Sequence, residues 1–301
     1  MPEWDPEIDI DADGARALID DQFPELRGAE LTRIDAGWDN IVFLVDGRWA
    51  FRFPRRAIAM PGVEREIEVL GRLAGHLPLP IPIPRWIGAP TEAYPFPWFG
   101  AAYVPGVELA VAALPDDARV EPARALGAFL RALHAPSLAR LVGTGLPVDP
   151  MRRADMALRV PFTRRRLAQA VAAGLWEPAD AVEDLLVDAA ALPPPPRTRV
   201  LHGDLHARHV LIADGRAAGV IDWGDVCMGD PAVDLSIAFS AFSGAAREAF
   251  VSAYGPIGRL TALRARVIGA FLSAALLVYA ADRGMDSLRA ESRLALDRVV
   301  S

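Results

Sequence analysis

Apolar and polar residues alternate along the stretch IVFLVDGRWAFRFP (41–54), which is interrupted by Asp46 and Gly47. Alternation with a period of two predicts two strands, and an Asp-Gly pair between them predicts a tight hairpin. From 63 to 74 the apolar residues recur at helical spacing instead. Glu66 lies in register with them, so this helix should turn one carboxylate towards its apolar face.

Prolines and small residues divide the rest of the chain. The run LPLPIPIPRWIG (77–88) is rich in proline, which removes amide donors, so it should be an extended connector leading to a strand at 98–104. After Gly106 the pattern becomes helical, with two helices expected over 151–191 and further helices after about residue 230. We therefore expect an α+β chain with a small β-rich lobe and a larger helical lobe.

Composition narrows the class of protein. The 301 residues are 52% hydrophobic and 24% charged, which suits a folded protein with a sizeable core. The net charge of -7 argues against a nucleic-acid partner, although it is compatible with a cationic substrate. A single cysteine, Cys227, and an acidic N-terminus indicate a cytoplasmic protein without disulfides or a signal peptide. The apolar stretch 267–281 is expected to be a buried helix, and no membrane partner is expected.

Candidate chemistry is concentrated in HGDLHARH (202–209), which holds three of the five histidines beside Asp204. Asp222 follows in GVIDWGD, again at the end of an apolar run. Phosphoryl transfer needs one carboxylate facing the nucleophile and another holding a metal on the phosphates. Two strands joined by the turn ADGRA (213–217) would bring Asp204 and Asp222 together. The pattern therefore predicts a phosphoryl-transfer site.

Other polar residues of this region have simpler interpretations. We expect His202 and His206 to support the loop, while Asp225 stays ambiguous. We expect Asp230 and Asp234 to cap and brace the next helix and loop, and Trp223 to pack in the core. The arginine run Arg164–Arg166 is expected to be a solvated helix face.

The combination of HGD, IDW and GDPAVDL resembles the aminoglycoside phosphotransferase family, which has the protein-kinase-like fold. The resemblance covers most of the chain and is nearest the 2''-aminoglycoside and macrolide phosphotransferase branches. It implies an N-lobe over 1–104 that ends in a hinge, and a C-lobe over 105–301. It also implies that Asp204 is the catalytic aspartate, and that Asp222 and His209 bind Mg²⁺.

The same resemblance assigns nucleotide-binding roles. Arg52 would contact the phosphates of ATP or GTP and pair with Glu66, and the backbone of Ala102 and Val104 would hold the purine. The loop DAGWDN, which contains Gly37, would cover the phosphates.

The acceptor is a hydroxyl of a small molecule, and no obligate protein partner is expected. The stretch 235–250 is apolar with one acid, Glu248, which favours an apolar acceptor such as a macrolide unless this face is core. An aminoglycoside stays open. Two alternatives remain: a pseudokinase, because His209 and Arg52 replace the usual asparagine and lysine, and a metabolic small-molecule kinase.

Overall fold

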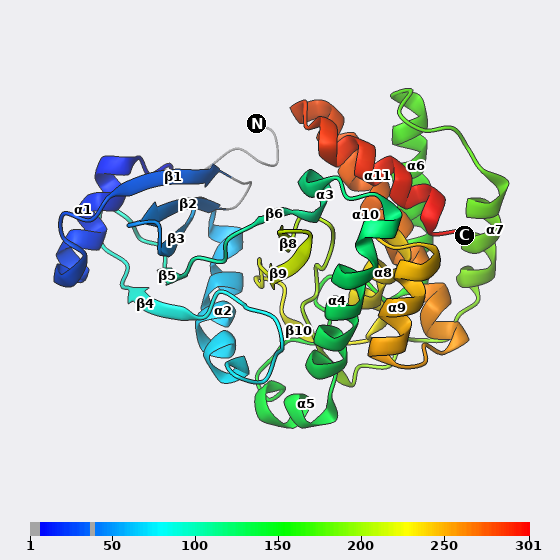
Figure 1. The fold of residues 1–301 in the computed structure, drawn as a ribbon, viewed down its shortest axis with the longest axis horizontal. Coiled ribbons are helices and arrows are strands. Elements are labelled where there is room, and N and C mark those ends of the chain that lie inside the picture. Colours follow the sequence, from blue (N-terminus) through cyan, green and yellow to red (C-terminus); the bar gives the residue numbers. More distant parts are fainter. Residues whose placement is uncertain (1–6, 37–39) are drawn as a thin grey trace. The chain divides into compact units, whose positions relative to one another are not determined.

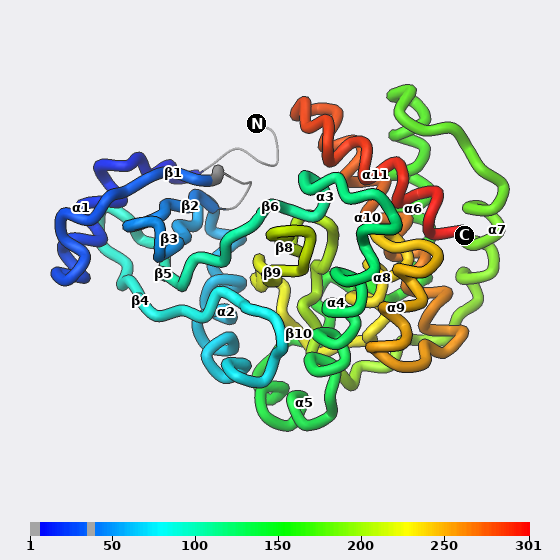
Figure 2. The backbone as a smooth tube through the Cα atoms, in the orientation of Figure 1, coloured from blue at the N-terminus to red at the C-terminus, as the bar shows by residue number. Residues whose placement is uncertain are grey.

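A computed structural model describes residues 7–36 and 40–301, and Figures 1 and 2 draw its chain path. The chain divides into two compact units: residues 1–74 with 81–104 form unit 1, and residues 75–80 with 105–301 form unit 2. The expected N-lobe also includes 75–80. These residues are grouped with unit 2, where the amide of Val220 donates to the carbonyl of Pro80 at 3.0 Å.

Unit 1 contains an antiparallel sheet of five strands in the order β1-β2-β3-β5-β4. The strands are β1 (Leu31–Ala36), β2 (Asn40–Val45), β3 (Trp49–Pro54), β4 (Pro84–Gly88) and β5 (Trp98–Ala102). The predicted hairpin is confirmed: Val45 pairs with Trp49, and both Asp46 and Gly47 have positive φ, at 50° and 64°. Positive φ at both central residues gives the turn whose twist matches that of the strands.

The helices of unit 1 are α1 (Ala12–Gln22) and α2 (Met60–Leu73), with short 3₁₀ turns at Pro24–Leu26 and Ala57–Ala59. As the spacing predicted, Val63 and Leu70 are buried on one face of α2, and Glu66 is buried with them. The apolar face of α2 therefore carries a carboxylate into the interior.

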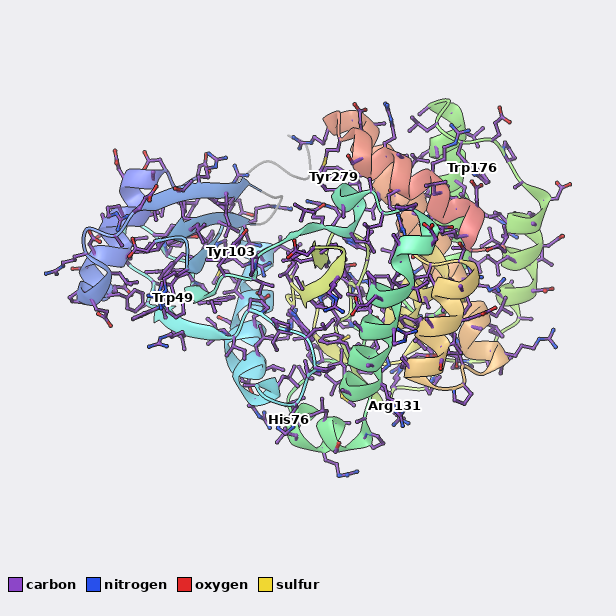
Figure 3. All side chains as sticks on the ribbon, in the orientation of Figure 1. Trp49, His76, Tyr103, Arg131, Trp176 and Tyr279 are labelled. Carbon is purple, nitrogen blue, oxygen red and sulfur yellow. The ribbon has the colours of Figure 1, made fainter. Side chains whose placement is uncertain are left out.

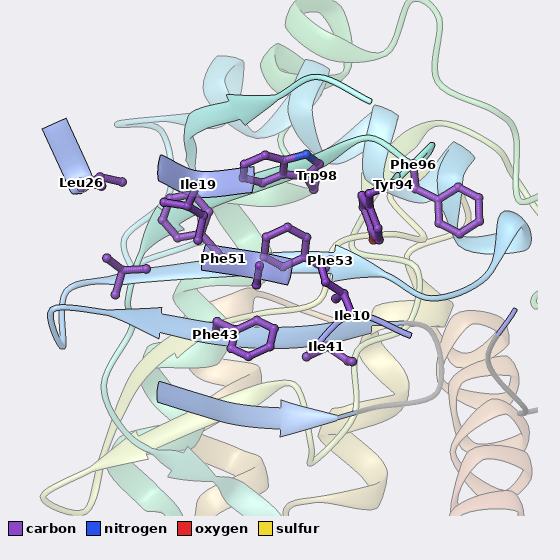
Figure 4. Close-up of a cluster of buried hydrophobic side chains, with 12 residues drawn as sticks. Ile10, Ile19, Leu26, Ile41, Phe43, Phe51, Phe53, Tyr94, Phe96 and Trp98 are labelled. Carbon is purple, nitrogen blue, oxygen red and sulfur yellow. The ribbon is translucent and has the colours of Figure 1, made fainter. Parts of the chain in front are cut away.

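Aromatic rings fill the core of unit 1 (Figure 4). Phe53 stacks on Trp98 with ring centroids 4.8 Å apart, and Phe51 lies 6.0 Å from the same indole. Gly88 on β4 permits this packing, because a Cβ there would lie 2.0 Å from the Trp98 ring. Since Arg52 lies between Phe51 and Phe53 on β3, its side chain points to the opposite face of the sheet.

Unit 2 is mainly helical (Figure 1). Its helices are α3 (Leu109–Ala112), α4 (Val120–Leu133), α5 (Pro136–Val142), α6 (Met156–Ala172), α7 (Asp180–Ala190), α8 (Ala232–Ser240), α9 (Gly244–Tyr254), α10 (Arg259–Arg283) and α11 (Asp286–Arg298), with a 3₁₀ turn at Asp116–Arg119. The two helices expected over 151–191 are α6 and α7.

Helix α10 contains the apolar stretch 267–281. It is 25 residues long, and an 18-residue window reaches a mean hydropathy of 1.6, enough by length and composition for a membrane span. Half of that window is buried inside the protein, and α10 packs on α6, α8 and α11. The packing agrees with the expected buried helix.

Short strands in unit 2 frame the polar loop. Strand β7 (Arg199–Leu201) pairs with β10 (Cys227–Gly229), and β8 (Val210–Ala213) pairs with β6 (Val107–Glu108) and β9 (Arg216–Val220). The β8–β9 turn has positive φ at Asp214 (50°) and Gly215 (73°). The loop 202–209 therefore leaves one two-stranded sheet and enters a second sheet.

Candidate active site

Gly203 lets the polar loop run close to the neighbouring segment. Its φ is 91°, and a Cβ there would lie 2.2 Å from the carbonyl oxygen of Asp225. Only glycine tolerates both the positive φ and this approach. The glycine before Asp204 is thus required by the backbone path that brings Asp204 near Asp225.

Asp234, in the first turn of α8, anchors the start of the loop. Its fully buried carboxylate accepts the amides of His202 at 2.8 Å and Gly203 at 3.0 Å, and it lies 3.1 Å from Nε2 of His134. This is the bracing role that the sequence predicted. Asp230 accepts the amide of Ala232 at 2.9 Å, which is the predicted cap of α8.

His202 supports the backbone from inside the loop. Its Nδ1 accepts the amide of Asp204 at 3.3 Å, so Nε2 carries the proton and donates to the carbonyl of Ile221 at 2.9 Å. Burial lowers the pKa of His202, with the neighbouring His209 adding to the effect. A neutral His202 therefore ties the loop to the residue before Asp222.

Asp204 lies against two nitrogen-bearing side chains. Nη2 of Arg153 is 3.3 Å from its Oδ1, and Nε2 of His206 is 3.6 Å from its Oδ2. Burial acts to raise the pKa of Asp204, but His206, Arg153 and His209 outweigh it and hold the pKa well below its usual range. The carboxylate of Asp204 is therefore ionised at neutral pH.

His209 faces Asp222. Its Nδ1 lies 2.8 Å from the carbonyl oxygen of Asp204, so this nitrogen donates, and Nε2 then points at Oδ2 of Asp222 from 3.3 Å. Burial and His206 lower the pKa of His209, which keeps Nε2 unprotonated at neutral pH. A lone pair and a carboxylate oxygen at this distance favour a cation between them. This donor pair fits a divalent metal ion.

The backbone also directs Asp222 into the site. Its φ is 64°, a left-handed conformation that costs a non-glycine residue energy and is found mainly where the surroundings enforce it. The expected pair of aspartates thus lies within unit 2, each beside a histidine of the same loop. Asp204, His206 and His209 each offer one atom that could bind a metal ion, and these three atoms lie within 4.8 Å of one another.

The predicted nucleotide residues lie in unit 1, apart from Gly37, which is outside the described residues. Nη1 of Arg52 contacts both carboxylate oxygens of Glu66, at 2.6 and 2.8 Å, which is the pair that the family resemblance implied. Ala102 ends β5, and Val104 lies just after it. Their contacts with a nucleotide stay predictions.

The structure decides between the two interpretations of the apolar stretch 235–250 in favour of core. The apolar stretch 235–250 forms most of α8 and most of α9, and its large side chains are almost fully enclosed: Leu235, Ile237, Phe242 and Phe250 are at most 1% exposed. They pack against α4 and α10 and are core. This stretch offers no open apolar wall, so it says nothing about a macrolide.

Arg153 is the main site residue that the sequence did not reveal. It comes from the segment between α5 and α6, 51 residues before Asp204, and contacts both Asp204 and Asp225. Its surroundings in the sequence, MRRADMALR, contain several arginines with no feature that singles it out. Trp223, by contrast, is fully buried as predicted.

Comparison with known proteins agrees with this geometry. Residues 30–267 match the profile of a family described as the phosphotransferase enzyme family. The chain belongs to this phosphotransferase family. It is a phosphotransferase, and its mixed fold, with a small antiparallel sheet and a helical part, is the expected kinase-like one.

Solved structures with the same fold include antibiotic kinases. The GDP and kanamycin complex of an aminoglycoside 2''-phosphotransferase is 22% identical, with 95% of this chain and 97% of that chain covered and a TM-score of 0.69. A type I macrolide 2'-phosphotransferase is 24% identical, with 97% and 98% covered and a TM-score of 0.62. The macrolide 2'-phosphotransferase MphH from Brachybacterium faecium is 26% identical, with 93% and 98% covered and a TM-score of 0.58. No curated protein sequence matches this chain.

Proposed function

We propose that this phosphotransferase moves the terminal phosphoryl group of ATP or GTP directly to a hydroxyl of a small molecule of the antibiotic type, a macrolide or an aminoglycoside. The observation that carries the proposal is the ionised carboxylate of Asp204 beside the facing pair of His209 and Asp222. Asp204 would accept a proton, and His209 and Asp222 would hold a metal ion that neutralises charge on the phosphates. Direct transfer needs both functions.

Asp204 takes the hydroxyl proton of the acceptor. As the acceptor oxygen forms its bond to phosphorus, the bond from phosphorus to the nucleoside diphosphate breaks and its electron pair leaves with the diphosphate. The proton moves to the carboxylate of Asp204 and then to solvent. Because the pKa of Asp204 is low, this carboxylate orients the hydroxyl and receives the proton late.

His209 and Asp222 would hold Mg²⁺. When bound, the ion supplies charge neutralisation on the donor phosphates. The hydrogen bond from Nδ1 of His209 to the Asp204 carbonyl fixes which ring nitrogen faces Asp222. Imidazole is a softer ligand than the oxygen that Mg²⁺ prefers, which makes the His209 side of this pair the weaker one.

Arg52 would contact the nucleotide phosphates, with Glu66 fixing its orientation. Arginine suits this role because a guanidinium binds phosphate oxygens with directed hydrogen bonds. The backbone of Ala102 and Val104 would hold the purine, and the loop with Gly37 would cover the phosphates. The related structures contain GDP, ADP or ATP, which supports a purine nucleotide as donor. A cytoplasmic location fits this donor.

The test is phosphoryl transfer by purified wild-type protein and by Asp204→Asn. With Mg²⁺ and ATP or GTP, we expect the wild-type protein to consume nucleotide when at least one member of a panel of macrolides and aminoglycosides is present as acceptor. The Asp204→Asn variant should lose about 10³-fold in kcat while binding nucleotide as before. The exposed Asp214→Asn, in the β8–β9 turn, is the matched control and should keep full activity.

The outcomes separate the alternatives. Nucleotide binding without turnover on any acceptor in wild type would support the pseudokinase. Turnover on sugars or amino alcohols but on neither antibiotic class would keep the mechanism and reassign the acceptor to metabolism. Equal turnover by Asp204→Asn and wild type would remove Asp204 from the reaction.

A further inference from the structure

A buried arginine lies on the acceptor side of the proposed reaction, within unit 2. Nη2 of Arg153 is 2.7 Å from Oδ2 of Asp225 and 3.3 Å from Oδ1 of Asp204. Its side chain is only 13% exposed. Burial acts to lower the pKa of Arg153, but the two aspartates outweigh it and raise the pKa. One fixed positive charge is therefore shared by the carboxylate of Asp204, which would face the acceptor, and that of Asp225 beside it.

A second arginine adds to this charge. Arg159 on α6 is 5% exposed, donates from Nε to the carbonyl of Arg153 at 3.2 Å and lies 4.2 Å from the ring centre of Phe271. Burial and the charge of Arg153 lower the pKa of Arg159 to about 10, so it is charged at neutral pH. Arg159 thus adds a second positive charge near Asp204, although only Arg153 contacts both Asp204 and Asp225.

The two acidic residues between α5 and α6 already have hydrogen-bond or ion-pair partners. Asp149 accepts the amides of Arg153 at 2.8 Å and Ala154 at 3.0 Å, and it is only 9% exposed. Asp155 pairs with Arg152 at 2.5 Å and accepts an amide at the start of α6. The segment between α5 and α6 therefore offers no uncommitted carboxylate to a cationic ligand.

We propose that Arg153 is a specificity-determining residue that selects against polycationic acceptors. The acceptor should be a hydroxyl compound that is uncharged or carries a single positive charge. This inference rests on the proposed function, in which Asp204 faces the acceptor hydroxyl. A polycation is recognised by unpaired carboxylates. Here Arg153 pairs with both, and its own charge repels an ammonium group.

Kanamycin serves as the polycationic probe, with affinity measured by calorimetry in the presence of ADP or GDP, so that no phosphoryl group is transferred. Replacing Arg153→Gln removes the charge and frees Asp204 and Asp225, so kanamycin affinity should rise about tenfold. Affinity for the nucleotide should stay unchanged. Adding Asp225→Asn to Arg153→Gln should take most of the gain away, because one of the two freed charges is then lost.

Two further variants separate charge from shape. Arg153→Lys keeps the charge and should bind kanamycin as weakly as wild type, while thermal unfolding checks that each variant folds. Arg165→Gln is the matched control: Arg165 is exposed on α6 and its guanidinium lies over the ring of Phe162, so its replacement should leave kanamycin affinity unchanged.

Binding is measured without turnover, so this inference and the proposed function fail differently. Tight kanamycin binding by wild type, or no gain in Arg153→Gln, overturns the selectivity and leaves the transfer mechanism standing. Undiminished transfer by Asp204→Asn overturns the mechanism. A tenfold gain in Arg153→Gln that Arg153→Lys and Arg165→Gln do not share supports the selectivity.

Discussion

The ion pair of Arg52 with Glu66 in unit 1 leaves its arginine as the more exposed member. In unit 2, where Arg153 bridges Asp204 and Asp225, the aspartates are the more exposed members. In unit 1 the carboxylate of Glu66 is fully buried, and the Arg52 side chain is 16% exposed. In unit 2 the Arg153 side chain is 13% exposed, while those of Asp204 and Asp225 are 26% and 35% exposed. The buried member fixes the geometry, and the more exposed member can meet a ligand.

This contrast matches the two halves of phosphoryl transfer. An arginine held by a buried acid is suited to phosphate, which carries negative charge. A carboxylate held by a buried arginine stays ionised and can accept a proton from a hydroxyl. Under the proposed function, the same two residue types would therefore serve the donor in one unit and the acceptor in the other, according to which member of the pair is less exposed.

The largest effect should come from breaking the pair in unit 1. Glu66→Gln removes the charge that balances Arg52 in a buried setting, and we expect the free energy of unfolding to fall by about 3 kcal/mol. The affinity for nucleotide should fall as well, because Arg52 loses its two contacts at 2.6 and 2.8 Å. Urea unfolding and nucleotide titration measure the two effects.

Glu64→Gln is the matched control, since Glu64 lies on the same helix α2 but is exposed. It should change the free energy of unfolding by less than about 0.5 kcal/mol. If Glu64→Gln and Glu66→Gln were equally stable, the buried carboxylate would not hold Arg52 in place.

The parts of this comparison that sequence could predict are local. The Asp46-Gly47 hairpin follows from residues that favour positive φ, and the loop from His202 to His209 carries its chemistry within eight residues. The contact of Arg52 with Glu66 joins adjacent elements, β3 and α2, and came from the family resemblance. Each of these features involves residues that are close together in the sequence.

The parts that sequence missed depend on long-range packing. Arg153 reaches Asp204 through a segment in which Asp149 and Arg152 have positive φ, at 32° and 48°, although neither is glycine. Aspartate tolerates positive φ, but arginine does not favour it, so turn propensity marks only part of this path. The apolar stretch 235–250 was open to two interpretations because hydrophobicity alone does not separate core from a ligand wall.

Acid should weaken unit 2 through its histidines. The folded-state pKa values of His202 and His209 lie below the ordinary 6.5. As pH falls below about 6.5, these two histidines therefore bind protons in the unfolded chain before they do so in the folded chain. The free energy of unfolding should decrease from pH 7 towards pH 5, by at most about 1.4 kcal/mol per histidine and pH unit.

Urea unfolding at several pH values measures this slope. His202→Gln should lower stability at pH 7 but reduce the slope, because one proton uptake is lost. His76→Gln is the control: His76 is exposed (Figure 3) and its removal should leave the slope unchanged. A free energy of unfolding that stays constant from pH 7 to pH 5 would contradict the neutral, buried state of His202 and His209.

The smallest effect should come from simplifying the bridge in unit 2. Asp225→Asn leaves Arg153 with Asp204 as its acidic partner, so the bridge becomes a single pair like that of unit 1. The loss of stability should stay below about 1 kcal/mol, because the Asp225 side chain is 35% exposed. Removing a nearby negative charge makes ionisation of Asp204 easier, and its pKa should fall further. If ionised Asp204 sets the acid limb of kcat/KM, that limb moves to lower pH in Asp225→Asn, and a move to higher pH would show that Asp225 is needed to hold Arg153 beside Asp204.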